Sequence, residues 1–344
     1  DNRISLTADV YRRLSDGQIM DRTVPLETGE KTSTFNIGSV RNTGIELGLQ
    51  VGVIRTKDFN WDLNMSFSRN WNKILELSNG KVDEVASNRF IGEPLNVLRD
   101  YLHTDVITDK GVTMKTKDGD IHYTLQEVYQ KYGWHEGQIG VHDWDNNGKI
   151  DDNDKQIFGC TDPKWMGSLT STMNYKDFDL SIMLYTKQGQ WSRSYFHERY
   201  LQYNDRGSQH MDFDYYIPKG TPVIDHNTGD IVYTTETHYG KYPYPTQSDA
   251  TAGGYFGDRG SAADEGWRYH KTSFVKVKNI CLGYTFPKQW ISKAGLQHLR
   301  LYLNVINPFC FTNYEGFDPE WASARLTDGG PASITYQIGA NIKF

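Results

Sequence analysis

The sequence predicts an all-β fold, and within that class a transmembrane antiparallel β-barrel. Three observations support the prediction: long stretches of alternating apolar and polar residues, a polar face opposite each apolar face, and connections that are alternately short and long. Alternation is typical of a strand whose two faces meet different surroundings. In an outer-membrane barrel the outward face meets lipid and the inward face lines a wet lumen.

Eight segments carry this strand pattern. In "TGIELGLQVGVI" (43–54), Ile45, Leu47 and Leu49 lie on one face and Glu46 and Gln50 on the other. Two of the eight segments, 166–175 and 273–286, alternate less regularly. In chain order the predicted strands are 4–10, 43–54, 59–67, 166–175, 178–185, 273–286, 299–305 and 333–344.

The connections between these strands separate a barrel from a sandwich. Alternation alone is equally typical of a soluble β-sandwich with one wet face. The links at 55–58, 175–177 and 287–298 are short, whereas the others run to about 20, 90, 85 and 25 residues. A strict alternation of short turns with long loops favours an outer-membrane barrel, because a sandwich has no reason to keep it.

Composition excludes several other classes. The net charge is −6 and there is no Lys/Arg-rich run, so we expect no nucleic-acid partner. No run of 18 apolar residues is present, so no transmembrane helix is expected. Cys160, Cys281 and Cys310 form no CxxC pair and predict neither a disulfide framework nor a zinc site. The chain begins inside a strand-like pattern without a signal peptide, so we expect it to be the later portion of a longer protein.

The stretch "VHDWDNNGKIDDNDKQIFG" (141–159) has the ligand spacing of an EF-hand calcium loop. Gly148 stands at the sharp turn and Ile150 at the apolar plug position. Aspartate replaces the usual final glutamate, and the flanks are strand-like or turn-like, so we expect a helix-free loop with a structural Ca²⁺. The alternative is a solvated acidic turn. The predicted ligands are Asp143, Asp145, Asn147, Lys149 (through its carbonyl), Asp151 and Asp154.

Seven segments in order resemble the SusC/RagA-like family of TonB-dependent outer-membrane transporters of Bacteroidota. They are "GSVRNTGIELGL" (38–49), "NKILEL" (72–77), "IGEPLNV" (91–97), "DWDNNGKIDDNDKQIFGCTDPKWMGSL" (143–169), "FVKVKNICLGYTFPK" (274–288), "LRLYLNVINPFCFTNYEGFDPE" (299–320) and "IGANIKF" (338–344).

The resemblance implies a domain organisation. Residues 1–344 would be the C-terminal part of a 22-stranded barrel, with extracellular loops at about 72–165 and 187–272. The N-terminal plug domain and TonB box are not in this sequence. The family also implies a SusD-like surface lipoprotein as lid, the TonB complex as energy source, outer-membrane lipid around the barrel, and location in the outer membrane of a Gram-negative bacterium.

The second long loop is rich in aromatic residues, and four of them are candidate substrate contacts. Aromatic rings stack on the apolar faces of sugars, although long loops also need rings for their own small cores. The four candidates are Trp191, Tyr195, Tyr200 and Tyr203.

Catalysis has little support in the sequence. The carboxylate pairs Asp318/Glu320 and Asp264/Glu265 are close in sequence, which does not establish the spacing that a glycosidase needs. The histidines lack metal spacing, and His142 is expected to be a surface imidazole. We therefore expect a transporter and not an enzyme.

The preferred function is energised import of oligosaccharides. Import of peptides by the same architecture is the first alternative. A soluble, calcium-stapled, glycan-binding β-sandwich and a secreted glycoside hydrolase are two further alternatives from other classes.

Overall fold

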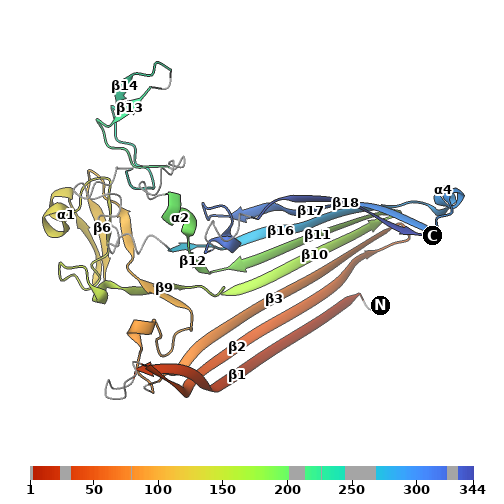
Figure 1. Ribbon diagram of the computed structural model, residues 1–344, viewed down its shortest axis with the longest axis horizontal. Helices are drawn as coiled ribbons and strands as arrows, with labels where there is room; N and C mark the ends of the chain where they lie inside the picture. Colours follow the sequence, from red (N-terminus) through yellow and green to blue (C-terminus); the bar gives the residue numbers. More distant parts are fainter. Residues whose placement is uncertain are drawn as a thin grey trace.

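One open sheet of eight strands forms the body of the molecule (Figure 1). The computed structural model describes residues 3–23, 32–78, 80–200, 214–225, 227–244, 269–323 and 332–344. In the order in which they pair, the strands are β1 (Ile4–Thr23), β2 (Thr32–Arg55), β3 (Phe59–Glu76), β10 (Trp165–Tyr175), β11 (Phe178–Gln188), β16 (Phe274–Thr285), β17 (His298–Thr312) and β18 (Thr335–Lys343).

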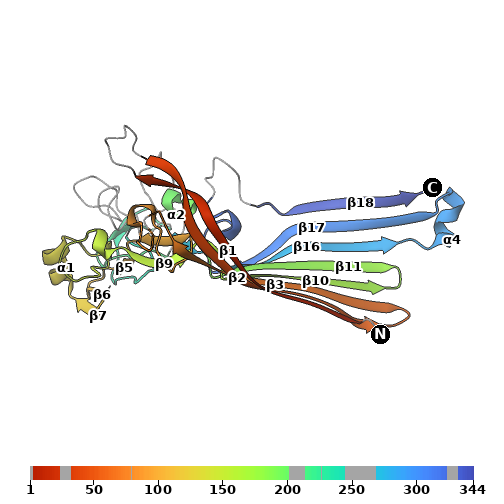
Figure 2. The same cartoon turned by 90° about the horizontal axis from the view of Figure 1, so that it is seen from below.

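Every neighbouring pair in this sheet is antiparallel, and each strand pairs with the next sheet strand along the chain. The short turns all lie at one end of the sheet and the long connections at the other (Figures 1 and 2). The predicted all-β class and the eight strands are therefore confirmed. The connections expected to be long do lie opposite the turns, but the first of them, at 24–31, is shorter than predicted and shorter than the link at 286–297. A single sheet is not the pair of packed sheets that a β-sandwich requires.

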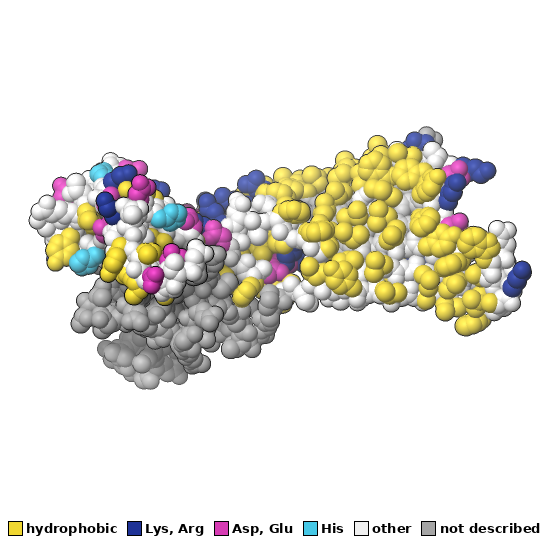
Figure 3. All heavy atoms as spheres, turned by 90° about the horizontal axis from the view of Figure 1, so that it is seen from above, with side chains coloured by type: hydrophobic (Ala, Val, Ile, Leu, Met, Phe, Trp, Pro, Cys, Tyr) yellow, Lys and Arg dark blue, Asp and Glu magenta, His cyan; other side chains and the backbone are white. Residues whose placement is uncertain are grey.

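The register places apolar side chains in rows across one face. Leu6, Leu49, Met65, Leu169 and Leu184 occupy successive strands in directly paired positions. Figure 3 shows this face as a broad hydrophobic surface along the sheet. Nothing in the described part of the chain covers it, and Ile338 on β18 is 86% exposed. The sheet thus presents to its surroundings the residues that a water-soluble protein would bury.

Some predicted strand boundaries are wrong. The strand predicted at 43–54 begins at Thr32, and the strand predicted at 299–305 ends at Thr312. The first strand continues from residue 10 to Thr23, and β3 continues through residues 72–76, which were expected to open a loop. Both extensions are more polar than the predicted segments, and pairing with β2 holds both of them. Backbone hydrogen bonds therefore continue the strands beyond the part that the hydrophobic pattern marks.

The connection between β3 and β10 contains a folded unit, which we call the loop unit (residues 97–160). It holds helix α1 (Leu125–Tyr132) and three antiparallel strand pairs. Its strands are β4 (Val97–Asp100), β5 (His103–Val106), β6 (Val112–Thr116), β7 (Gly119–Tyr123), β8 (Ile139–Val141) and β9 (Gln156–Cys160).

The loop unit has a hydrophobic core of its own. Ile107, Met114 and Val128 are fully buried and pack together with Val112. Thr124 starts α1 with a capping box, in which its side chain and that of Glu127 bond reciprocally to backbone groups. This long connection is therefore a small domain rather than an irregular loop.

The remaining elements lie in the other connections. The β11–β16 connection holds β12 (Trp191–Arg193) paired with β15 (Tyr269–Lys271), helix α2 (Tyr195–Tyr200), and a projecting hairpin of β13 (Pro222–Ile224) and β14 (Ile231–Tyr233) (Figure 1). Helix α4 (Lys288–Ile291) and the 3₁₀ turn Ser292–Ala294 join β16 to β17. Further 3₁₀ turns are Val85–Ser87, Asp152–Asp154 and Pro319–Trp321.

Among the described residues, no helix has the length and apolar character needed to cross a membrane.

Candidate functional site

The acidic loop connects β8 to β9 inside the loop unit. Asp143 follows β8 by two residues and Asp154 precedes β9 by two residues. The two strands pair with different partners, β5 and β4. A group bound by both ends of this loop would therefore tie two separate strand pairs together.

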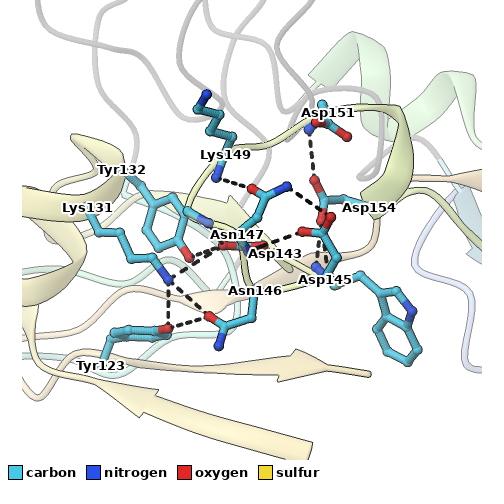
Figure 4. A network of polar contacts seen from close by, with 12 residues as sticks. Tyr123, Lys131, Tyr132, Asp143, Asp145, Asn146, Asn147, Lys149, Asp151 and Asp154 are labelled. Atoms are coloured by element: carbon cyan, nitrogen blue, oxygen red, sulfur yellow. Dashed lines mark hydrogen bonds and ion pairs between the residues drawn. The ribbon is translucent and has the colours of Figure 1, made fainter. Parts of the chain in front are cut away.

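Three predicted ligands converge in this loop (Figure 4). Carboxylate oxygens of Asp143, Asp145 and Asp154 all lie within 4.8 Å of one another. Asp143 and Asp154 are buried and Asp145 is half-buried. Three carboxylates at this spacing form the kind of hard-oxygen cluster that a divalent cation such as Ca²⁺ prefers.

Backbone amides hold the two buried carboxylates in place. Asn147 N–H donates to Oδ1 of Asp143 at 3.1 Å, and Gly148 N–H donates to its Oδ2 at 2.8 Å. Trp144 N–H donates to Oδ1 of Asp154 at 2.7 Å, and Asp151 N–H donates to its Oδ2 at 2.8 Å. The loop is thus folded around its first and last acidic residues, so their positions are defined by the backbone.

The charges in this cluster are only partly balanced. Lys131 Nζ lies 3.6 Å from Oδ2 of Asp143, and the Tyr132 hydroxyl donates to the same oxygen at 2.7 Å. Burial opposes ionisation of Asp143, but the hydrogen bonds from Tyr132 and Gly148 outweigh it and lower the pKa of that carboxyl. Burial and the nearby charge of Asp143 raise the pKa of Asp154. A bound cation would offset the repulsion that remains between these carboxylates.

The other predicted ligands lie at the margin of the cluster. The Asn147 side-chain amide donates to Oδ2 of Asp145 at 2.9 Å, and its Oδ1 accepts from the Lys149 N–H at 2.7 Å. Asp151 instead caps the 3₁₀ turn that follows, accepting from Asn153 N–H at 2.8 Å. The six-residue ligand set therefore stays a prediction, of which three side chains are brought together.

Two residues of the motif behave as predicted. Gly148 has φ +83°, the left-handed conformation that the sharp turn requires. Ile150 packs against the small cluster of Tyr101 and Val141. The flanks are strand β8 and the 3₁₀ turn leading to β9, so the predicted absence of paired helices is confirmed.

His142, beside the acidic loop, is not the surface imidazole that we expected. It is 7% exposed, and its Nδ1 accepts a hydrogen bond from Lys115 N–H at 3.0 Å. Burial lowers the pKa of His142 to about 4. The strand pairing of the loop unit encloses this side chain, which the local sequence does not reveal.

Two of the four predicted substrate-contact rings can be placed. Trp191 is half-buried and packs edge-on against Phe158 at a centroid distance of 5.3 Å. Tyr195 is also half-buried, with the Arg193 guanidinium 5.2 Å from its ring centroid. The Tyr200 side chain and Tyr203 lie outside the described residues, as do Asp264 and Glu265. A substrate role for these rings stays a prediction.

The carboxylates of Asp318 and Glu320, considered above as a catalytic pair, accept hydrogen bonds from two lysines of β16. Lys276 on β16 is 2% exposed and donates to both oxygens of Asp318, at 2.6 and 2.7 Å, and to Glu320 at 2.6 Å. Lys278 also donates to Glu320, at 2.6 Å. Burial opposes ionisation of Glu320, but the hydrogen bonds from the two lysines outweigh it and lower its pKa.

This ion-pair network joins the sheet to the β17–β18 connection. A second contact joins the β11–β16 connection to the β17–β18 connection. Ser194 Oγ is 2.6 Å from the Tyr314 hydroxyl and 2.6 Å from His197 Nδ1. Sequence reasoning missed the network, although two lysines at alternate positions of the strand segment "FVKVKN" could have indicated inward-facing cations.

The face of the sheet opposite the hydrophobic surface is polar. Asn70 and Asn72 both donate to Oδ1 of Asn42 at 2.9 Å, and the hydroxyls of Ser66 and Ser168 are 2.7 Å apart. Together with the antiparallel meander, this two-sidedness is the pattern of a transmembrane β-barrel sheet.

Comparison with known proteins narrows this class. No family model matches the chain. It is 26% identical over 351 residues to the TonB-dependent receptor SusC of Bacteroides thetaiotaomicron, covering 99% of this chain and 30% of the relative. It is 27% identical over 379 residues to the TonB-dependent receptor P39 of Formosa agariphila, covering 99% and 34%. The chain therefore spans about a third of the length of these relatives.

Solved structures agree with the fold. The RagAB peptide transporter structure matches with a TM-score of 0.64 at 18% identity, covering 100% of this chain and 34% of that chain. The "open-open" RagAB structure matches with a TM-score of 0.62 at 19% identity. At these identities the likeness establishes the fold. Over its whole length, the chain is a homologue of TonB-dependent receptors of the SusC type.

Proposed function

We propose that this chain forms part of the barrel of an outer-membrane importer that takes up oligosaccharides in a Gram-negative bacterium. The uncovered hydrophobic face of the sheet carries the proposal. Apolar side chains that nothing in the described chain covers are stable when lipid surrounds them, and the polar face then lines a wet interior. Such a protein would act by binding its substrate and gating its passage, without making or breaking covalent bonds.

The proposed partners follow from homology to SusC-type receptors. A SusD-like surface lipoprotein would cover the end of the barrel that carries the long connections. The TonB complex would supply energy through a plug domain and a TonB box elsewhere in the complete transporter. The folded loop unit and the network around Lys276 support this arrangement, because they give the long-connection end an ordered surface for a lid.

For the substrate, we propose that rings in the β11–β16 connection stack on sugar faces. Trp191 and Tyr195 are half-buried, so each ring is anchored while part of it stays accessible. Nearby Arg193 and Lys271 could hydrogen-bond sugar hydroxyls. If the same architecture imports peptides instead, we expect the peptide to bind without stacking on Trp191 and Tyr195.

For the acidic loop, we propose a structural Ca²⁺ held by Asp143, Asp145 and Asp154. The spacing of their oxygens and the partial charge balance by Lys131 support a divalent cation at this position. Bound calcium would link the β8 and β9 ends of the loop unit and stiffen it. It would take no part in transport chemistry.

The first experiment fractionates membranes of the source cells, extracts the complete transporter in detergent, and identifies what copurifies. We expect a detergent-requiring complex that contains plug-domain sequence and a lipoprotein. Titration of this complex with oligosaccharides and with peptides then decides the substrate class. Recovery of the chain in the aqueous fraction without partners would contradict the importer.

The calcium proposal is tested on the purified transporter by hydrogen exchange in excess Ca²⁺ and in chelator. We expect slower exchange over 141–160 with calcium, since a ligand at a hundred times its Kd stabilises the bound state by about 2.7 kcal/mol. Asp154→Asn should abolish the difference. Asp152→Asn, at an exposed neighbour outside the cluster, is the matched control. Equal exchange with and without calcium in the wild type would contradict the proposal.

A further inference from the structure

The short-turn end of the sheet carries a rim of aromatic and basic side chains. The turns at 55–58 and 175–178, helix α4 with its following turn, and the end of β18 all gather at this end (Figures 1 and 2). They border the hydrophobic face directly, and Figure 3 shows Lys and Arg side chains along that border.

Aromatic rings line the border. Tyr175, Phe178 and Trp290 are each at least half exposed. Phe178 lies against Tyr284 at a centroid distance of 4.7 Å, and Tyr284 lies against Phe286 at 4.9 Å. Amphipathic rings concentrated at one edge of an apolar surface are typical of the level where hydrocarbon gives way to lipid headgroups.

The charge at this end is positive although the whole chain is negative. Two aspartates, Asp58 and Asp177, are the acidic residues of these turns. No lysine of the rim forms an ion pair with a described residue, in contrast to Lys276 and Lys278 at the other end. The five exposed lysines of the rim are Lys57, Lys176, Lys288, Lys293 and Lys343.

Helix α4 holds part of this rim in a defined orientation. Ile291 is buried, whereas Trp290, on the next position, is 59% exposed. The turn closes through Gly295 at φ +75°, and Gln297 N–H donates to the Lys343 carbonyl at 2.8 Å, which ties the segment to β18. Lys288 and Lys293 are therefore presented from a folded element with an exposed indole between them in sequence.

We propose that this rim binds the headgroups of anionic glycerophospholipids in the membrane leaflet at the short-turn end. The inference rests on the proposed function, because it requires the hydrophobic face to lie in lipid. The apolar face and the rim are continuous, so acyl chains would lie on the sheet while the phosphate meets the lysines. A compact ammonium group on a flexible stem suits a phosphate as a point charge, and clusters of lysine near a bilayer favour anionic lipid.

The experiment titrates phosphatidylglycerol into the intact transporter in neutral detergent and follows retained lipid by native mass spectrometry. Phosphatidylcholine and free glycerol phosphate are the comparison ligands. We expect retention of phosphatidylglycerol over both. Lys288→Gln with Lys293→Gln should weaken its binding about 30-fold, since each lysine near a lipid surface contributes about fivefold.

Two further variants control for folding and for general charge. Lys288→Arg with Lys293→Arg keeps the charge and should keep binding. Lys81→Gln with Lys219→Gln removes two exposed lysines away from this rim and should leave binding unchanged.

Equal retention of the two phospholipids, competition by free glycerol phosphate at equal strength, or an unchanged affinity in the Gln variant would overturn the proposal. A transporter that needs detergent but shows no preference for phosphatidylglycerol would overturn this inference alone. A chain that stays in the aqueous fraction would overturn the importer as well.

Discussion

The eight-stranded sheet and the loop unit use the same residue types in opposite ways. In the loop unit, Ile107 and Met114 are 0% exposed. In the sheet, Leu6 is 66% exposed and Ile338 is 86% exposed. One region buries its aliphatic side chains against each other, and the other turns them outward over a continuous face.

This difference shows that the two regions are built for different solvents. A core excludes water by packing, whereas an outward apolar face needs an apolar environment. Polar side chains of the sheet lie on the opposite face, where asparagine and serine pairs form hydrogen bonds. Hydrophobicity along the chain thus identifies strands, but the surroundings decide which side of each strand is the interior.

The largest expected effect lies where the sheet meets the β17–β18 connection. Lys276→Met leaves the buried Asp318 and the half-buried Glu320 with fewer counter-charges, so it should destabilise the β17–β18 connection by about 3–5 kcal/mol. Hydrogen exchange over residues 313–323 measures the loss. Lys164→Met, at an exposed lysine, is the control. Combining Lys276→Met with Asp318→Leu should recover stability, and a double variant as unstable as the single one would argue against the ion pair.

Shortening a buried side chain should destabilise the loop unit more than shortening an outward-facing side chain destabilises the sheet. Met114→Ala opens a cavity at a fully buried position and should cost about 2–5 kcal/mol of the stability of the loop unit. Met65→Ala, on the exposed face of the sheet, should cost less than half as much. Denaturant unfolding of the detergent-solubilised transporter gives both values, and equal losses would contradict the difference in packing.

An arginine introduced on each face of one strand should show which face meets lipid and which meets water. Leu169 and Thr170 are neighbours on β10 whose paired partners are the apolar Met65 and the polar Asn64. Leu169→Arg should cost about 2–4 kcal/mol if the residue lies near the bilayer midplane. Thr170→Arg should be nearly neutral. Folding in phospholipid vesicles measures both, and similar costs would mean that the hydrophobic face does not meet lipid.

A pH dependence should arise at His197, a buried residue of the β11–β16 connection. Burial lowers its pKa to about 3 from the ordinary 6.5, so the unfolded chain binds the extra proton between these pH values. The contribution of neutral His197 to the free energy of unfolding is complete above pH 6.5. It declines as the pH falls, and at pH 5 it is lower by about 2 kcal/mol. Thermal unfolding across this range checks the slope. His197→Gln should flatten it, and an unchanged slope in that variant would place the titration elsewhere.

The sequence predicted the sheet well because its physical signal is local. A period of two marks each strand, and short turns such as 55–58 mark one end. The shape of the acidic loop was also visible locally, since spacing alone indicates that Asp143 and Asp154 approach each other and that Gly148 takes a positive φ.

Contacts between distant segments could not be read in this way. The pairing of Lys276 with Asp318 joins residues 42 positions apart, and each residue taken singly resembles a solvated charge. The burial of His142 depends on strands brought together from both sides of α1. The ends of β1 and β3 were misplaced because hydrogen bonding, rather than hydrophobicity, extends them.

The position of the loop unit between β3 and β10 also constrains the order of events in assembly. If the sheet crosses a bilayer, residues 97–160 must pass to the long-connection side before β3 and β10 can pair along their length. A folded unit of this size is harder to translocate than an extended chain. Met114 and Val128, which pack together in the loop unit, would therefore come together only after passage, as would the two ends of the acidic loop. On this route the proposed Ca²⁺ would bind only after passage, and its binding would hinder return of the segment.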